Sequence, residues 1–95
     1  NKVYVQAKRY VAGSSVGRPE LQAFVGALIG KADRGVFITT STFSSSAIEY
    51  ADRNTTTRLI LIDGDRLTDL MIRFGVGEQV KETFHVVEVD EDFFQ

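Results

Sequence analysis

The chain has 95 residues and a formal net charge of −2, and this length suits a single small domain with one core. It contains no cysteine and one histidine, which excludes a disulfide framework, a thiolate zinc site and a histidine metal cluster. Its apolar runs are about a strand long, far below the roughly 20 residues that cross a bilayer, and its first residues do not form a signal peptide. We therefore expect a cytoplasmic protein in which any metal ion is held by oxygen atoms.

Charge is unevenly distributed along the chain. Residues 1–34 carry six basic and two acidic side chains, whereas residues 35–95 carry five basic and eleven acidic ones. A local positive field at the N-terminal end favours a polyanionic partner, but an uneven solvated surface explains the imbalance equally well.

The chain opens on VYVQAKRY, whose β-branched and aromatic residues alternate as in a strand. One face would carry Val3, Val5 and Ala7, and the other Tyr4, Gln6, Lys8 and Tyr10. The strand begins at residue 2 with no initiator methionine, so we expect that a segment upstream has been lost.

Helices and strands are predicted to alternate along the rest of the chain. A helix over 19–29 begins at Pro19 and ends at Gly30, and two further helices are predicted over 44–51 and from 63–65 to Gly75. The runs GVFIT (35–39) and RLILI (58–62) lack polar alternation, which is typical of central parallel strands buried on both faces. Residues 83–89 are predicted as an edge strand. The sequence thus predicts an α/β fold of order β-α-β-α-β-α-β, with a mixed or parallel sheet flanked by helices.

Burial is predicted for the two central runs and the helix between them. Val36, Ile38, Leu59 and Leu61 should be almost fully buried, and Ala47, Ile48 and Ala51 should point inward.

The triplet Gln6-Ala7-Lys8 is the first candidate for chemistry. Residues two apart on a strand place Gln6 and Lys8 on one face, about 7 Å apart, where both can reach one ligand. An unpaired buried lysine would be costly, so Lys8 must meet an anion, a metal-bound water or solvent. On its own, the polar outer face of an edge strand explains the triplet better than a site does.

Four segments in order give the triplet a context: QAKRY, RPELQAFVGAL, GVFITTSTFS and LILIDGDRLTDLM. Together they resemble the catalytic domain of Mrr-type restriction endonucleases, a branch of the PD-(D/E)xK nuclease superfamily, over nearly the whole chain. The resemblance implies a restriction-endonuclease-like sandwich and a DNA endonuclease of restriction type that hydrolyses phosphodiester bonds with Mg²⁺. Whether modified DNA is its target stays open. Nicking of two strands by one site per subunit would favour a homodimer.

The resemblance also implies roles for the triplet. Gln6, with the backbone carbonyl of Ala7, would bind the Mg²⁺ ion, and Lys8 would be the catalytic lysine. The acidic metal ligand of the superfamily lies upstream of this strand and has no counterpart here. We therefore interpret residues 1–95 as the C-terminal part of one nuclease domain, expected to be inactive alone.

Further candidates surround the triplet. Arg9 and Tyr10 continue its strand and suit a nucleic-acid backbone, although an exposed strand end explains them equally well. Thr39, Thr40 and Ser41 match a motif segment of the family and are candidate DNA contacts, with capping of the next helix as the simpler explanation. Glu20 and Gln22 are candidates for supporting the active site. Asp63 and Asp65 are predicted to cap a helix rather than to bind metal.

Two other functions stay open. The chain could be a non-catalytic module with a nuclease-like core that binds DNA or another partner. It could also bind a nucleotide or phosphate ligand through the TTSTFS loop.

Overall fold

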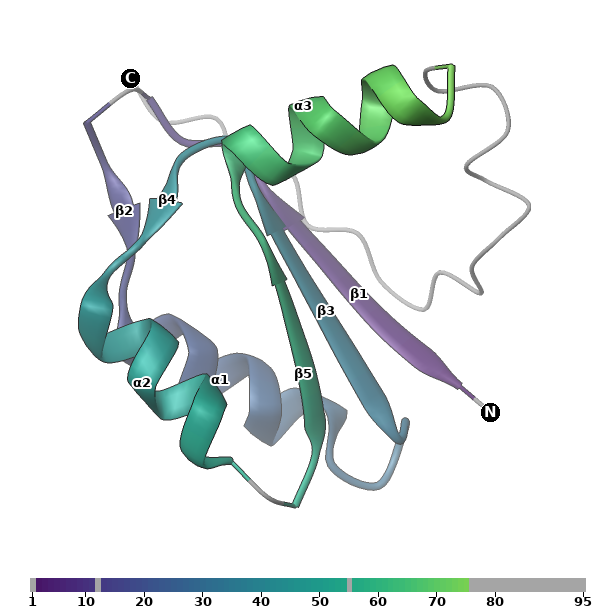
Figure 1. The fold of residues 1–95 in the computed structure, drawn as a ribbon. Coiled ribbons are helices and arrows are strands. Elements are labelled where there is room, and N and C mark those ends of the chain that lie inside the picture. Colours follow the sequence, from purple (N-terminus) through teal and green to yellow (C-terminus); the bar gives the residue numbers. More distant parts are fainter. Residues whose placement is uncertain (1, 12, 55, 76–95) are drawn as a thin grey trace.

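The computed structural model describes residues 2–11, 13–54 and 56–75 (Figure 1). The elements are β1 (Val3–Lys8), β2 (Ser15–Val16), α1 (Arg18–Leu28), β3 (Arg34–Thr39), β4 (Thr42–Phe43), α2 (Ser45–Arg53), β5 (Arg58–Ile62) and α3 (Gly64–Arg73).

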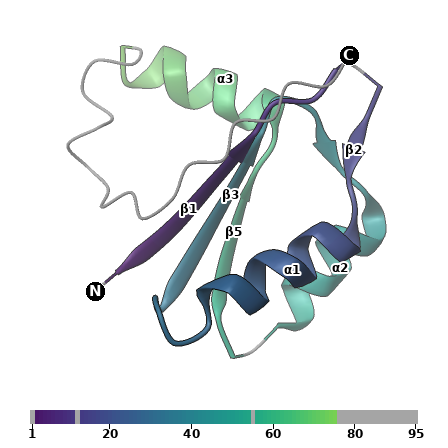
Figure 2. The ribbon, with the colours of Figure 1, turned by 180° about the vertical axis from the view of Figure 1, so that it is seen from behind.

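The main sheet contains three parallel strands in the order β1-β3-β5. Its register aligns Val5 with Val36 and Val36 with Ile60. The crossover helices α1 and α2 lie toward the same side of this sheet, and α3 crosses the carboxyl end of the strands on the other side (Figures 1 and 2). The α/β fold with parallel strands and flanking helices is confirmed.

One detail of the predicted order differs among the described residues. The strands β2 and β4 pair in parallel with each other and were not predicted, because two residues are too few to show an alternation. The predicted strand over 83–89 lies outside the described residues.

The helix boundaries follow the predicted signals closely. The side chain of Glu20 accepts a hydrogen bond from the amide of the N-cap residue Gly17 (3.0 Å) at the start of α1. Ser44 caps α2 and Asp63 caps α3, through bonds from the amides of Ala47 (3.1 Å) and Arg66 (2.9 Å). The capping role predicted for Asp63 is therefore confirmed.

The core lies between α1 and one face of the sheet, here called the α1 face. Tyr4 stacks on Phe24 with ring centroids 5.7 Å apart, and Phe24 meets Phe37 edge-on at 5.3 Å. A Cβ on Gly35 would lie 2.6 Å from the Leu28 side chain, so this glycine lets the helix approach β3 closely. The face of β1 that carries Tyr4, Gln6 and Lys8 is therefore not polar along its whole length, because Tyr4 is 3% exposed and belongs to the core.

Burial of the two apolar runs is lower than predicted at three positions. Val36 is 4% exposed as expected, but Ile38, Leu59 and Leu61 are only half-buried. For Leu59 and Leu61 the reason is that β5 forms an edge of the three described strands rather than a central strand. Ile48 is also exposed, which corrects its inward placement, whereas Ala47 is fully buried.

Among the described residues, no helix is both long and apolar enough to cross a membrane.

Candidate active site

Gln6 and Lys8 lie on the α1 face of β1, on the same side as Tyr4. Alternate residues of a strand share a face, and Tyr4 is fixed there by its contact with Phe24. The register confirms this placement, because Gln6 aligns with the core residue Phe37 and Lys8 with Thr39. Both side chains are half-buried, and neither residue is without an interaction partner. One face of β1 thus changes from core at its amino end to polar groups at its carboxyl end.

The loop after β3 is tied to the end of β1. The Thr40 amide donates to the Lys8 carbonyl (3.3 Å), and the Thr40 hydroxyl both accepts from the Tyr10 amide (3.0 Å) and donates to the Tyr10 carbonyl (3.2 Å). These three bonds continue the β1–β3 pairing beyond its last ladder residue. They hold the backbone from the Lys8 carbonyl to Tyr10 in place.

The other hydroxyls of this loop also have structural partners. Thr39 is fully buried, and its hydroxyl accepts from the Ser41 amide (3.1 Å). The Ser41 hydroxyl donates to the carbonyl of Ser14. Of the three DNA contacts predicted on this loop, only Thr40 is exposed, while Ser41 is half-buried. Their role in DNA binding stays a prediction.

Glu20 is connected to the triplet strand through Tyr10. The Tyr10 hydroxyl donates a hydrogen bond to one carboxylate oxygen of Glu20, and the other oxygen accepts a hydrogen bond from the Gly17 amide. The first turn of α1 is thereby joined to the continuation of β1. Of the two supporting residues predicted on this helix, Glu20 is joined to the site, whereas Gln22 is exposed on α1.

The start of α3 is fitted against the same loop. The Gly64 amide donates to the Ser41 carbonyl (2.8 Å), and a Cβ at Gly64 would lie 2.4 Å from the Thr40 carbonyl oxygen. A residue with a side chain would displace the loop. Sequence reasoning missed Gly64 and Ser14, although the glycine between Asp63 and Asp65 was the available signal for a close backbone approach.

The described residues offer few charged ligands for a divalent metal ion. No group of three or more His, Cys, Asp or Glu side chains in residues 2–11, 13–54 and 56–75 is arranged to hold a metal ion. Gln6 and a backbone carbonyl offer neutral oxygens, and the Glu20 carboxylate is already hydrogen-bonded on both oxygens. A hard dication binds better with charged ligands, so these residues would need an additional carboxylate.

Comparison with known proteins agrees with this arrangement. The described residues form an α/β domain with a parallel sheet, in which the Gln-x-Lys strand lies beside a hydroxyl-rich loop. The family model described as "Restriction endonuclease", the Mrr catalytic type, matches residues 1–71, and the chain belongs to this family. The resemblance inferred from the sequence is thus confirmed.

The chain is similar to one curated protein and to one solved structure of the restriction type. The chain is 52% identical over 95 residues to the type IV methyl-directed restriction enzyme EcoKMrr of Escherichia coli K12, covering 99% of this chain and 30% of that protein. The fold is similar to that of the DNA modification-dependent restriction endonuclease AspBHI, with a TM-score of 0.68 and 24% identity over 77% of this chain and 19% of that one. The chain therefore spans less than a third of the length of either protein.

Proposed function

We propose that this chain carries the catalytic lysine of a Mg²⁺-dependent DNA endonuclease of restriction type. The observation that carries the proposal is the placement of Gln6 and Lys8 together on the polar carboxyl end of β1, in a chain of the restriction endonuclease family. The substrate is a DNA phosphodiester bond. The relatives named as methyl-directed and modification-dependent support modified DNA as the target.

Lys8 acts on the developing charge of the reaction. Its ammonium group orients the attacking water and stabilises negative charge on the phosphate oxygens, while the bonds from Thr40 fix the backbone that carries it. When bound, Mg²⁺ would polarise the phosphate and lower the pKa of a water molecule. Gln6 and the Ala7 carbonyl would be two of its ligands.

The remaining ligand in this proposal is a carboxylate outside the described residues. Residues 1–95 then form the C-terminal part of a nuclease domain, and the chain alone is inactive. DNA would be approached by Arg9, Tyr10, Thr40 and Ser41 around the triplet. Cleavage of both strands by one site per subunit favours a homodimer, and the cytoplasmic location stays a prediction.

The test compares two lysines of the same strand region in the protein that contains the complete nuclease domain. Lys8→Ala should lower the rate of DNA cleavage by about 10²–10³-fold with little change in DNA affinity, because the charge serves the transition state. Lys2→Ala, at the exposed residue just before β1, is the matched control and should cleave normally. Gln6→Ala should raise the Mg²⁺ concentration required. Unimpaired cleavage by Lys8→Ala would overturn the proposal.

The second candidate is a non-catalytic DNA-binding module. It is favoured by the lack of a metal-binding carboxylate cluster among the described residues. The complete protein would then bind DNA in a salt-dependent way but would not cleave it at any Mg²⁺ concentration.

A further inference from the structure

Two arginines stand side by side at the amino end of the main sheet. Arg34 begins β3 and Arg58 begins β5, and the register of these parallel strands aligns the two residues. Neighbouring strands lie about 4.8 Å apart, and aligned residues point to the same face. Both side chains therefore project from one face of the sheet, within reach of a single small ligand. We call these two residues the arginine pair.

The arginine pair carries two like charges that no described residue neutralises. Both side chains are exposed, and neither forms an ion pair with another described residue. Asp33 precedes Arg34 and Asp52 lies near the end of α2, but both carboxylates are exposed and neither is paired with these arginines. Like charges on facing residues of adjacent strands repel each other, so a bound anion would relieve this repulsion.

Positive charge extends along the same end of the sheet. Lys2 directly precedes β1 and is exposed, and the Asp33 amide donates to its carbonyl (3.3 Å), which holds Lys2 beside the start of β3. Lys31, in the connection between α1 and β3, is also exposed. Basic side chains therefore outnumber acidic ones at this end, and an approaching anion meets a positive potential.

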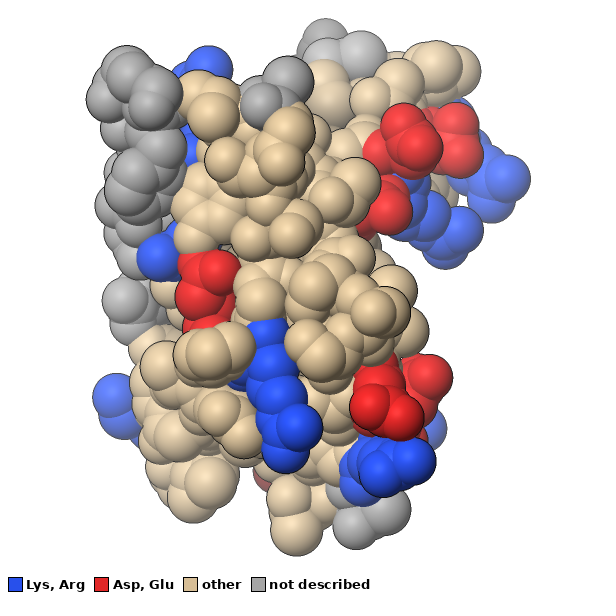
Figure 3. Space-filling model, turned by 90° about the vertical axis from the view of Figure 1, so that its left-hand side faces the viewer, with Lys and Arg blue, Asp and Glu red and all other residues tan. Residues whose placement is uncertain are grey.

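The charged side chains of the helices are arranged differently. On α2, Arg53 forms an ion pair with Glu49 (3.3 Å). Figure 3 shows two groups of charged side chains on the right, and in each group acidic and basic side chains lie next to each other. Neighbouring opposite charges reduce the attraction of these groups for a further anion.

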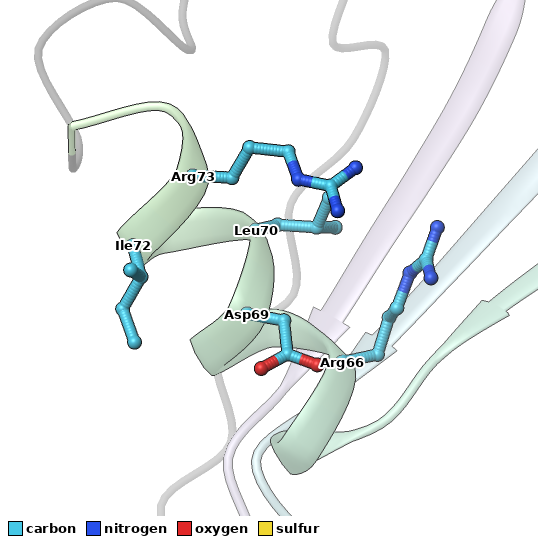
Figure 4. A pocket seen from close by; sticks show the side chains of 5 residues that line it. All are labelled: Arg66, Asp69, Leu70, Ile72 and Arg73. Carbon is cyan, nitrogen blue, oxygen red and sulfur yellow. The ribbon is translucent and has the colours of Figure 1, made fainter.

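Arg66 and Arg73 of α3 also project from one side of an element (Figure 4). They extend on the same side of the helix as Leu70 and line one pocket together with Asp69. These two arginines are seven residues apart, which is about 10 Å along a helix, and Asp69 lies between them in the sequence. The arginine pair has about half that spacing, and no residue lies between its members in the sheet.

We propose that the arginine pair binds one phosphate group. A guanidinium presents its N–H donors in a planar fork that matches two oxygens of a phosphate, and two guanidiniums on one face can contact different oxygens of the same group. A phosphodiester of the DNA backbone and a free phosphate ion offer this same oxyanion chemistry. The experiments below distinguish these two sources.

The proposed phosphate site is separate from the candidate active site. Lys8 aligns with Thr39, which is five residues along β3 from Arg34, or about 17 Å at 3.3 Å per residue. Val3 aligns with Arg34, and Val3 and Lys8 lie on opposite faces of β1, so the arginine pair faces away from Lys8. A phosphate bound there is not the one that is cleaved. The proposal therefore does not depend on the proposed nuclease function.

The first test measures how DNA affinity depends on salt, without Mg²⁺, in the protein that contains the complete nuclease domain. Arg34→Gln combined with Arg58→Gln should reduce the slope of log K against log salt concentration by about 0.9, the value for one phosphate contact, and weaken binding about 10-fold at low salt. Arg53→Gln is the matched control and should leave the slope unchanged, because Arg53 is exposed but already paired with Glu49. Arg34→Lys combined with Arg58→Lys keeps the charge and should keep the slope, which separates loss of charge from misfolding.

The second test uses inorganic phosphate as the probe, at constant ionic strength with chloride as the reference anion. Saturable changes in the amide NMR signals of Arg34 and Arg58, with an unchanged DNA slope in the Gln double variant, would assign the site to a free phosphate ion. A reduced slope would assign it to the DNA backbone.

Two results would overturn the proposal. One is an unchanged slope in the Gln double variant together with no saturable effect of phosphate on the two arginine amides. The other is an equal loss of slope in Arg53→Gln, which would indicate a general effect of net charge. Because neither test requires cleavage, a protein that never cleaves DNA would contradict the nuclease function and leave the phosphate site to be decided by these measurements.

Discussion

The two ends of the α1 face are built from different interactions. At the amino end, Tyr4, Phe24 and Phe37 form an aromatic core against α1, with Gly35 allowing close contact. At the carboxyl end, Thr40 and Ser41 are held by hydrogen bonds to β1, α3 and the loop around Ser14. One strand, β1, contributes to both ends.

This difference indicates how a small domain supports a polar site. Apolar burial holds the amino end of β1 against α1, but because such packing is non-directional it tolerates small shifts of the strand. The hydrogen bonds at the other end are directional and fix the backbone beside Lys8. The first region should therefore determine global stability, and the second the geometry of the site.

The largest effect is expected from Phe24→Ala. Phe24 is 2% exposed and contacts Tyr4 and Phe37, so its loss should lower the free energy of unfolding by about 3–5 kcal/mol. Gln22→Ala on the exposed side of the same helix is the control and should change it by less than about 0.5 kcal/mol. Urea denaturation measures both; a similar stability for the two variants would contradict the assignment of the core.

A smaller effect is expected from Gly64→Ala at the polar end. Its Cβ would collide with the Thr40 carbonyl, a backbone atom, so we expect a loss of about 1–3 kcal/mol and slower DNA cleavage in the complete nuclease. Gly26→Ala is the matched control, since its Cβ meets no atom within 4 Å, and alanine should stabilise the helix by about 0.5–1 kcal/mol. Unaltered stability and cleavage for Gly64→Ala would argue against a tight contact between α3 and the loop.

The smallest effect is expected from Tyr10→Phe. It removes the hydroxyl that donates to Glu20 but leaves the Gly17 amide on that carboxylate, so we expect a loss of about 1 kcal/mol. Tyr50→Phe, on α2, is the control for removing a phenol elsewhere. If Glu20 supports the site through Tyr10, DNA cleavage by the complete nuclease should fall in Tyr10→Phe and not in Tyr50→Phe. Equal cleavage by both would assign Glu20 to helix capping alone.

Local sequence patterns were sufficient for the helices and the three main strands. The stripe Leu21, Phe24, Val25 and Leu28 is buried as its spacing predicted, and the caps at Ser44 and Asp63 were readable because capping depends on residues three apart. Four segments in order, one of which contains the triplet Gln6-Ala7-Lys8, also carried the resemblance to Mrr-type nucleases, and the family match confirms that resemblance.

Long-range contacts determined the rest. Alternation placed Tyr4, Gln6 and Lys8 on one face of β1. Only the position of α1 decided that Tyr4 enters the core, while Lys8 lies at the polar carboxyl end of the strand. The same applies to β5, whose apolar run is identical in character to β3 and yet lies at an edge of the described sheet. The β2–β4 pair and the bonds from Ser14 and Gly64 to Ser41 join residues far apart in sequence. Periodicity records which side chains share a face, whereas the neighbours of that face are decided by how the whole chain packs.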